Sequence, residues 1–237
     1  ATPARITPSA GPKPAVASDP VLQWVSTPLP VRRRISLASL VRGCGTTSLT
    51  RELALMLARQ RPDRLLVVST ADPDRSRLSR LEPPHTVRRL DSEYWNDPRG
   101  CWRDAVGDAQ RVHDLTVTDW GAVPVSQLNH VASESHALCL VAPADRKVVQ
   151  SSLDYAAELG KRVPVLMAVV DVRGEIGPSV RPLVRNLPVK TVLLRHDPRH
   201  HNGAPPPEQL REPEALQVYR LAADLIGALA GNRRNAG

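Results

Sequence analysis

The stretch Leu40-Val41-Arg42-Gly43-Cys44-Gly45-Thr46-Thr47-Ser48 joins an apolar segment, 35–40, to residues 49–59, whose apolar side chains recur at helical spacing. Glycines at 43 and 45 permit a tight turn, and the hydroxyl residues that follow are suitable helix caps. A loop of small residues between a strand and a helix turns backbone amides inward, and the helix N-terminus adds partial positive charge, which favours a phosphate group. The alternative, a tight turn that binds nothing, stays open at this point.

Beyond this loop, short apolar runs alternate with longer amphipathic stretches, a pattern that predicts βαβ units and a parallel sheet. The predicted strands are 35–40, 65–69, 86–90, 114–118, 136–142, 163–170 and 189–194. The predicted helices are 49–59, 101–112, 146–159 and 208–229. The expected fold class is α/β, with a mostly parallel central sheet flanked by helices.

The chain ends differ from this pattern. Residues 1–30 contain seven of the 23 prolines, which exclude a helix or a central strand there. We expect a flexible Pro-rich arm over 1–30, with one docking point at 21–25, a single domain over 31–230 and a disordered tail over 231–237.

Composition excludes several classes of protein. Of the 237 residues, 41% are hydrophobic, and no apolar run reaches the length of about 18 residues that a membrane-spanning helix needs. Three cysteines without metal-ligand spacing suit a reducing cytosol. The net charge is +8, but residues 1–34 hold five basic side chains and one acidic one, so half of the excess is expected in the arm and at 32–34, outside the sheet.

The loop resembles the one of the ParA/MinD family of deviant-Walker ATPases, which reads K-G-G-x-G-K-T-T. The residues that match are Gly43, Cys44, Gly45, Thr47 and Ser48. Two lysines of the family are replaced in this sequence. Thr46 occupies the position of the lysine that touches the β- and γ-phosphates, and Val41 occupies the position of the signature lysine that reaches a neighbouring subunit. Arg42, next to Val41, occupies a position that is glycine in the family.

Later segments resemble this family in the same order. Residues 66–74 are similar to L-L-V-D-A-D-P-Q, with Thr70 at the first aspartate and Asp72 at the second. Residues 113–122 are similar to Y-D-x-V-V-I-D-x-P-A, which places Asp119 at the end of a strand. Residues 169–173 resemble V-V-N-R with Asp171 at the asparagine, and 196–198 resemble the turn that ends in Pro198.

The resemblance implies a P-loop NTPase fold of the SIMIBI, MinD-like kind that binds ATP and Mg²⁺. In the implied roles, Asp72 orients the attacking water, and Thr47 and Asp119 hold Mg²⁺. The implied nucleotide contacts are Arg42, Gly43, Cys44, Gly45, Thr46, Thr47, Ser48, Asp171 and Pro198.

Both lysines that would neutralise the transferring phosphoryl group are absent, and this predicts a pseudo-ATPase. We expect a regulatory, positioning or assembly partner in the bacterial cytosol, acting through a protein partner or self-association. Because Val41 replaces the signature lysine, the sequence argues against an ATP-driven dimer specifically. The alternatives are a slow ATPase, in which Arg42 replaces the lysine, and a DNA-associated partition factor. The leader Thr27-Pro28-Leu29, just before Arg32-Arg33-Arg34 and the first strand, also resembles actinobacterial MinD-like proteins that are found beside type VII secretion systems and carry Pro-rich arms.

The scarce aromatic residues concentrate at Tyr94, Trp95, Trp102 and Trp120, near several arginines. Three interpretations stay open: stacking of single-stranded nucleic acid, a protein interface, and core packing of an arm over the edge of the sheet.

Overall fold

The computed structural model describes residues 25–26, 28–29, 31–71, 78, 81–90, 98–174, 176–196 and 212–231. Most of the predicted arm and the predicted tail beyond Gly231 therefore lie outside the described residues. Tyr94 and Trp95 lie outside them as well.

The centre of the molecule is a seven-stranded sheet whose pairings are all parallel. The strands lie in the order β3-β2-β4-β1-β5-β6-β7. Their bounds are β1 Arg33–Ser39, β2 Leu65–Ser69, β3 Thr86–Arg89, β4 Leu115–Ala122, β5 Ala137–Pro143, β6 Val165–Val170 and β7 Thr191–Leu194. Because every pairing is parallel, all seven strands end at the same edge of the sheet, and the loop at 40–45 lies at that edge.

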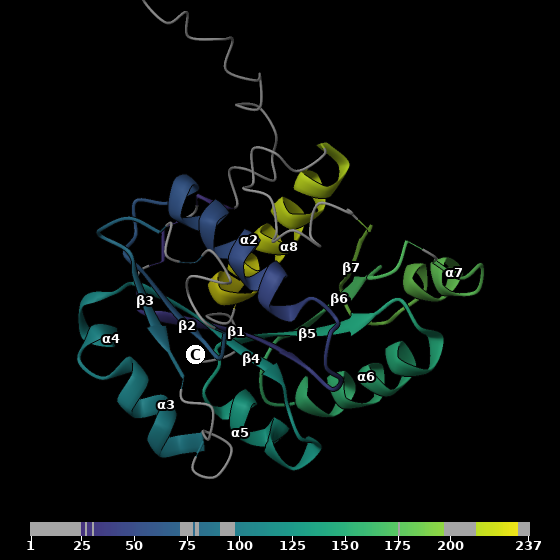
Figure 1. Ribbon diagram of the computed structural model, residues 1–237, viewed down its shortest axis with the longest axis horizontal. Coiled ribbons are helices and arrows are strands. Elements are labelled where there is room, and N and C mark those ends of the chain that lie inside the picture. Colours follow the sequence, from purple (N-terminus) through teal and green to yellow (C-terminus); the bar gives the residue numbers. More distant parts are fainter. Residues whose placement is uncertain are drawn as a thin grey trace, which may run out of the picture.

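Helices cover both faces of the sheet (Figure 1). On one face lie α2 (Thr46–Gln60) and α8 (Glu212–Gly231). On the other lie α3 (Pro98–Val106), α4 (Ala109–Val112), α5 (Leu128–Ser133) and α6 (Arg146–Leu159), while α7 (Val180–Arg185) lies beside the β7 edge. A 3₁₀ turn, η2 (Val125–Gln127), leads into α5.

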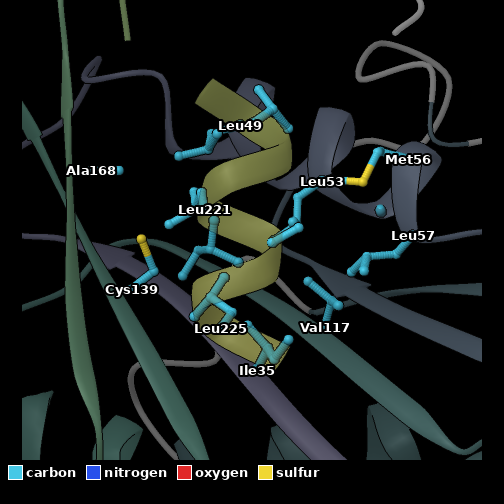
Figure 2. Close-up of a cluster of buried hydrophobic side chains, with 14 of the residues drawn as sticks. Ile35, Leu49, Leu53, Met56, Leu57, Val117, Cys139, Ala168, Leu221 and Leu225 are labelled. Carbon is cyan, nitrogen blue, oxygen red and sulfur yellow. The ribbon is translucent and has the colours of Figure 1, made fainter. Parts of the chain in front are cut away.

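Each face has its own apolar core. Figure 2 shows the first, in which Leu53 of α2 and Leu221 and Leu225 of α8 meet side chains of the central strands such as Ile35 and Val117. Aliphatic side chains dominate this core, as expected for a chain without phenylalanine.

The second core contains two of the tryptophans. Trp102 and Trp120 are buried and stack with ring centroids 6.4 Å apart. The indole N–H of Trp120 donates to the Ser36 hydroxyl (3.0 Å), and that of Trp102 donates to the Thr118 hydroxyl (3.3 Å). Burial in the core is therefore confirmed for these two rings, although Trp120 belongs to the central strand β4 and not to an arm over the edge of the sheet.

Several predicted boundaries were wrong. The helix expected over 101–112 is two helices, α3 and α4, because Gly107 takes a left-handed φ of +39° between them. The strand expected to stop at 118 continues to Ala122, so Asp119 lies inside β4 and not at its end. The short helices α5 and α7 were not predicted, because they have too few turns for their apolar residues to show a clear helical period. Arg33 and Arg34, expected outside the sheet, are the first residues of β1.

Candidate functional site

The loop between β1 and α2 contains two left-handed glycines. Gly43 has φ +74° and Gly45 has φ +85°, a region that strains any residue with a Cβ. Helix α2 begins directly after Gly45, whose carbonyl accepts the N–H of Leu49 (2.9 Å). The amides of residues 46–48 precede that first helical bond, so they have no carbonyl partner within the helix. The loop therefore combines an α-helix N-terminus with a backbone conformation that favours anions.

Hydrogen bonds fix the start of this loop to the neighbouring strand. The Ser39 hydroxyl lies 3.0 Å from the Val41 carbonyl and 3.1 Å from the Gly121 carbonyl, and can donate to either. Sequence reasoning missed Ser39, although a hydroxyl at the end of an apolar strand is a signal that could have found it.

The two positions of the missing lysines carry inward-facing side chains. Thr46 is only 5% exposed, and its hydroxyl lies 3.4 Å from the Cys44 thiol. That thiol also donates to the Val41 carbonyl (3.2 Å), so Cys44 and Thr46 pack beneath the loop. Val41 is half-buried against the core. Arg42 is exposed at the loop surface.

Asp119 is the centre of a buried polar cluster. Its Oδ2 accepts hydrogen bonds from the Thr47 hydroxyl (2.7 Å) and the Ser69 hydroxyl (2.9 Å), and its Oδ1 accepts the Gly121 N–H (3.0 Å). The side chain is fully buried, and this burial raises the pKa of its carboxyl group, while the hydroxyl donors oppose the rise.

The structure brings Thr47 and Asp119 together, as their predicted shared role requires. Sequence reasoning missed Ser69, which joins them because β2 pairs with β4 in the register that sets Ser69 beside Asp119. Parallel pairing between strands distant in sequence leaves no local signal, so no pattern within residues 65–69 could have found it.

Asp171 interacts with its own turn. Its Oδ1 accepts the N–H of Gly174 (2.8 Å) and the N–H of Arg173 (3.3 Å), in the manner of an Asx turn. This arrangement satisfies one carboxylate oxygen locally. Asp72 and Pro198, the other predicted contacts, lie outside the described residues.

The residues of the site supply oxygen ligands for a magnesium ion, but only some of the groups that bind a phosphate. Hydroxyl and carboxylate oxygens are ligands that Mg²⁺ accepts, and Thr47 and Asp119 supply one of each. The loop amides suit phosphate oxygens, but neither residue 41 nor residue 46 supplies an ammonium group. Among the described residues there is no group of three or more His, Cys, Asp or Glu side chains that could hold a metal ion. In the same part of the chain no helix is long and apolar enough to cross a membrane.

Solved structures resemble this chain over most of its length. MinD of Pyrococcus horikoshii, complexed with Mg-ADP, is 17% identical, with a TM-score of 0.60 and coverage of 86% of this chain and 99% of that one. The MinC:MinD complex of Aquifex aeolicus gives 15% identity, a TM-score of 0.59 and coverage of 82% and 96%. A ParA family ATPase from Chlorobium tepidum gives 13% identity, a TM-score of 0.55 and coverage of 87% and 99%.

No protein-family model and no curated protein matches the sequence. At identities this low the structural likeness establishes the architecture alone. The all-parallel order of the strands agrees with that likeness. This chain has the fold of the ParA and MinD P-loop ATPases.

Proposed function

We propose that this chain is a ParA/MinD-type protein whose nucleotide site has lost hydrolytic activity and which acts as a regulatory or positioning partner in the bacterial cytosol. The observation that carries the proposal is the pair of side chains at the lysine positions. Thr46 is buried beneath the loop against Cys44, and Val41 packs against the core.

The chemistry of phosphoryl transfer explains why this pair matters. Negative charge on the transferring group must be neutralised by cations placed beforehand, and removing one such stabiliser lowers the rate by roughly 10²–10³. Two lysines are absent here, so hydrolysis would fall to a negligible rate. The loop amides, Thr47 and Asp119 would still hold phosphate and Mg²⁺, which would supply charge neutralisation when bound.

A role through protein contacts follows from the loss of catalysis. The similar structure from Aquifex aeolicus is a complex of MinD with MinC, and this supports a partner protein for the present chain. Position 41 is valine and not the lysine that an ATP-driven dimer needs, so we propose that nucleotide does not drive self-association. We also propose that the protein acts beside a secretion system, and the support for this is the resemblance of its Pro-rich arm to those of secretion-associated MinD-like proteins.

One observation favours a second function, slow ATP hydrolysis. Arg42 is exposed at the loop surface, and a guanidinium can bind a phosphate with two hydrogen bonds. In that case Arg42 would supply the charge that Thr46 and Val41 lack.

Phosphate release under single-turnover conditions tests both functions. We expect the wild-type protein to release phosphate no faster than the Asp119→Asn variant. Restoring the cations with Val41→Lys and Thr46→Lys should raise the rate by about 10² or more. Thr46→Gln, which adds length without charge, is the matched control and should leave the rate unchanged.

A wild-type rate well above that of Asp119→Asn would contradict the proposal. If Arg42→Ala then abolished that rate, the slow ATPase would be the correct function. Titration calorimetry with Mg-ATP and Mg-ADP on the same proteins separates loss of binding from loss of chemistry.

A further inference from the structure

Three consecutive arginines, Arg32, Arg33 and Arg34, lie at the edge of the sheet opposite the loop. Strand β1 starts at Arg33 and ends at Ser39, and seven strand residues span about 20 Å. This arginine cluster is therefore remote from the candidate nucleotide site, and nothing in the proposed function uses it.

The charge of the three guanidinium groups is unpaired among the residues that the structure describes. Arg33 and Arg34 each have a buried Nε without a hydrogen-bond partner. Within the described residues none of the three arginines forms an ion pair. The Arg34 guanidinium lies over the Trp102 ring, 5.7 Å from its centroid. The Nε atoms are buried and out of reach of a ligand, so it is the unneutralised positive charge of the cluster that favours a negatively charged ligand.

The acidic side chain beside the cluster is already compensated. Asp114 accepts the backbone N–H of Arg64 (3.0 Å), and its carboxylate lies 4.0 Å from the Arg64 Nε. Asp114 therefore does not cancel the charge of the three arginines.

A histidine next to the cluster is consistent with this excess of positive charge. The Nδ1 of His136 accepts the backbone N–H of Arg34 (3.0 Å), so the neutral ring carries its proton on Nε2. Burial, together with the charges of Arg34 and Arg33, lowers the pKa of His136 to about 4. The ring is therefore uncharged near neutral pH.

The cluster continues into an open hollow that is partly apolar. Leu29, Val31, Arg32 and Asp114 line this hollow. Val31 is 51% exposed, one of four exposed large hydrophobic side chains among the described residues. Arg32 thus lies beside apolar side chains in this hollow, whereas Arg33 and Arg34, consecutive residues of β1, point to opposite faces of the sheet.

We propose that this edge of the sheet binds an acidic peptide segment of a partner protein. Carboxylates of a peptide that lies across the strand ends would pair with Arg32 in the hollow and with Arg33 at the start of β1, and an apolar side chain would cover Leu29 and Val31. A nucleic acid fits less well, because a phosphodiester chain gains little from covering Leu29 and Val31. A peptide also has N–H groups that can donate to the Asp114 carboxylate.

Fluorescence anisotropy with a short labelled peptide of alternating Glu and Leu tests this site. We expect the full chain to bind it, and Arg32→Gln with Arg33→Gln to weaken binding at least about tenfold, because two charge-assisted contacts are lost. The matched control is Arg181→Gln with Arg185→Gln, which removes equal charge from exposed positions of α7 and should leave affinity within about twofold.

Further measurements make the outcome decisive. Arg32→Gln alone, at an exposed position, should weaken binding without changing the urea midpoint, which separates binding from folding. The Gln-Leu version of the peptide should not bind. Peptide binding should also raise the pKa of His136, read from its ring resonances.

Equal losses in the two double variants would mean that only general charge attraction acts, and this would overturn the proposal. So would absence of peptide binding. Tighter binding of DNA of equal charge, lost in Arg32→Gln with Arg33→Gln, would replace the peptide by a nucleic acid.

Discussion

The hydrogen bond from Thr47 to Asp119 provides a direct test of the candidate site. Replacing Thr47 by Val removes the hydroxyl while keeping the branched shape of the side chain. The acceptor is a fully buried carboxylate 2.7 Å away, and hydrogen bonds to charged groups contribute about 1.5–3 kcal/mol. We therefore expect Thr47→Val to lower the free energy of unfolding by about that amount at pH 7.

The matched control lies one turn further along the same helix. The Thr50 hydroxyl is buried and donates to the neutral carbonyl of Thr46 (2.9 Å). A neutral bond contributes about 0.5–1.5 kcal/mol, so Thr50→Val should cost roughly 1 kcal/mol less than Thr47→Val. Urea unfolding without nucleotide measures both variants, and Asp119→Asn completes a double-mutant cycle with Thr47→Val.

The pH dependence has a defined sign. Burial raises the pKa of Asp119 above 3.8, so the folded protein binds this proton more tightly than the unfolded chain does. Stability from this group is full below pH 3.8 and is lost as pH rises through the folded pKa. The Thr47 hydroxyl favours the ionised form, so the cost of Thr47→Val should grow from pH 4 to pH 7. Equal costs for the two valine variants, or additivity in the cycle, would refute a charged Asp119 held by Thr47.

Three other changes have expected outcomes. Gly45→Ala should destabilise by about 1–2 kcal/mol, because a Cβ is strained at φ +85°, whereas Gly227→Ala inside α8 should stabilise by about 0.5–1 kcal/mol; thermal unfolding compares them. His136→Asn keeps an acceptor for the Arg34 N–H but cannot titrate. The pKa of His136 falls from 6.5 to about 4 on folding, so wild type should lose stability relative to this variant as pH falls from 6.5 to 4, measured by urea unfolding. Leu221→Ala removes a fully buried side chain and should cost about 2–5 kcal/mol; a smaller loss in urea unfolding would mean that the core between α8 and the sheet relaxes to fill the space.

The sequence predicted the helices and strands whose apolar residues recur with a strong helical or strand period. Helix α6 has the predicted bounds, and β2 matches its predicted strand, because apolar spacing and burial coincide there. Helices α5 and α7 were missed because each has six residues, too few for a period to stand out. The break at Gly107 was missed because a glycine inside a helical pattern does not by itself reveal its φ.

The site divides in the same way. The sequence by itself determined the α/β class, the loop of Gly43 and Gly45, and the absence of lysine at 41 and 46, since composition and local spacing contain this information. Only the tertiary structure decided that Ser69 joins Thr47 at Asp119, and that Arg33 and Arg34 begin a central strand. These contacts depend on the order β2-β4-β1, and parallel strands separated by helices pair through packing of the whole sheet, which no local pattern encodes.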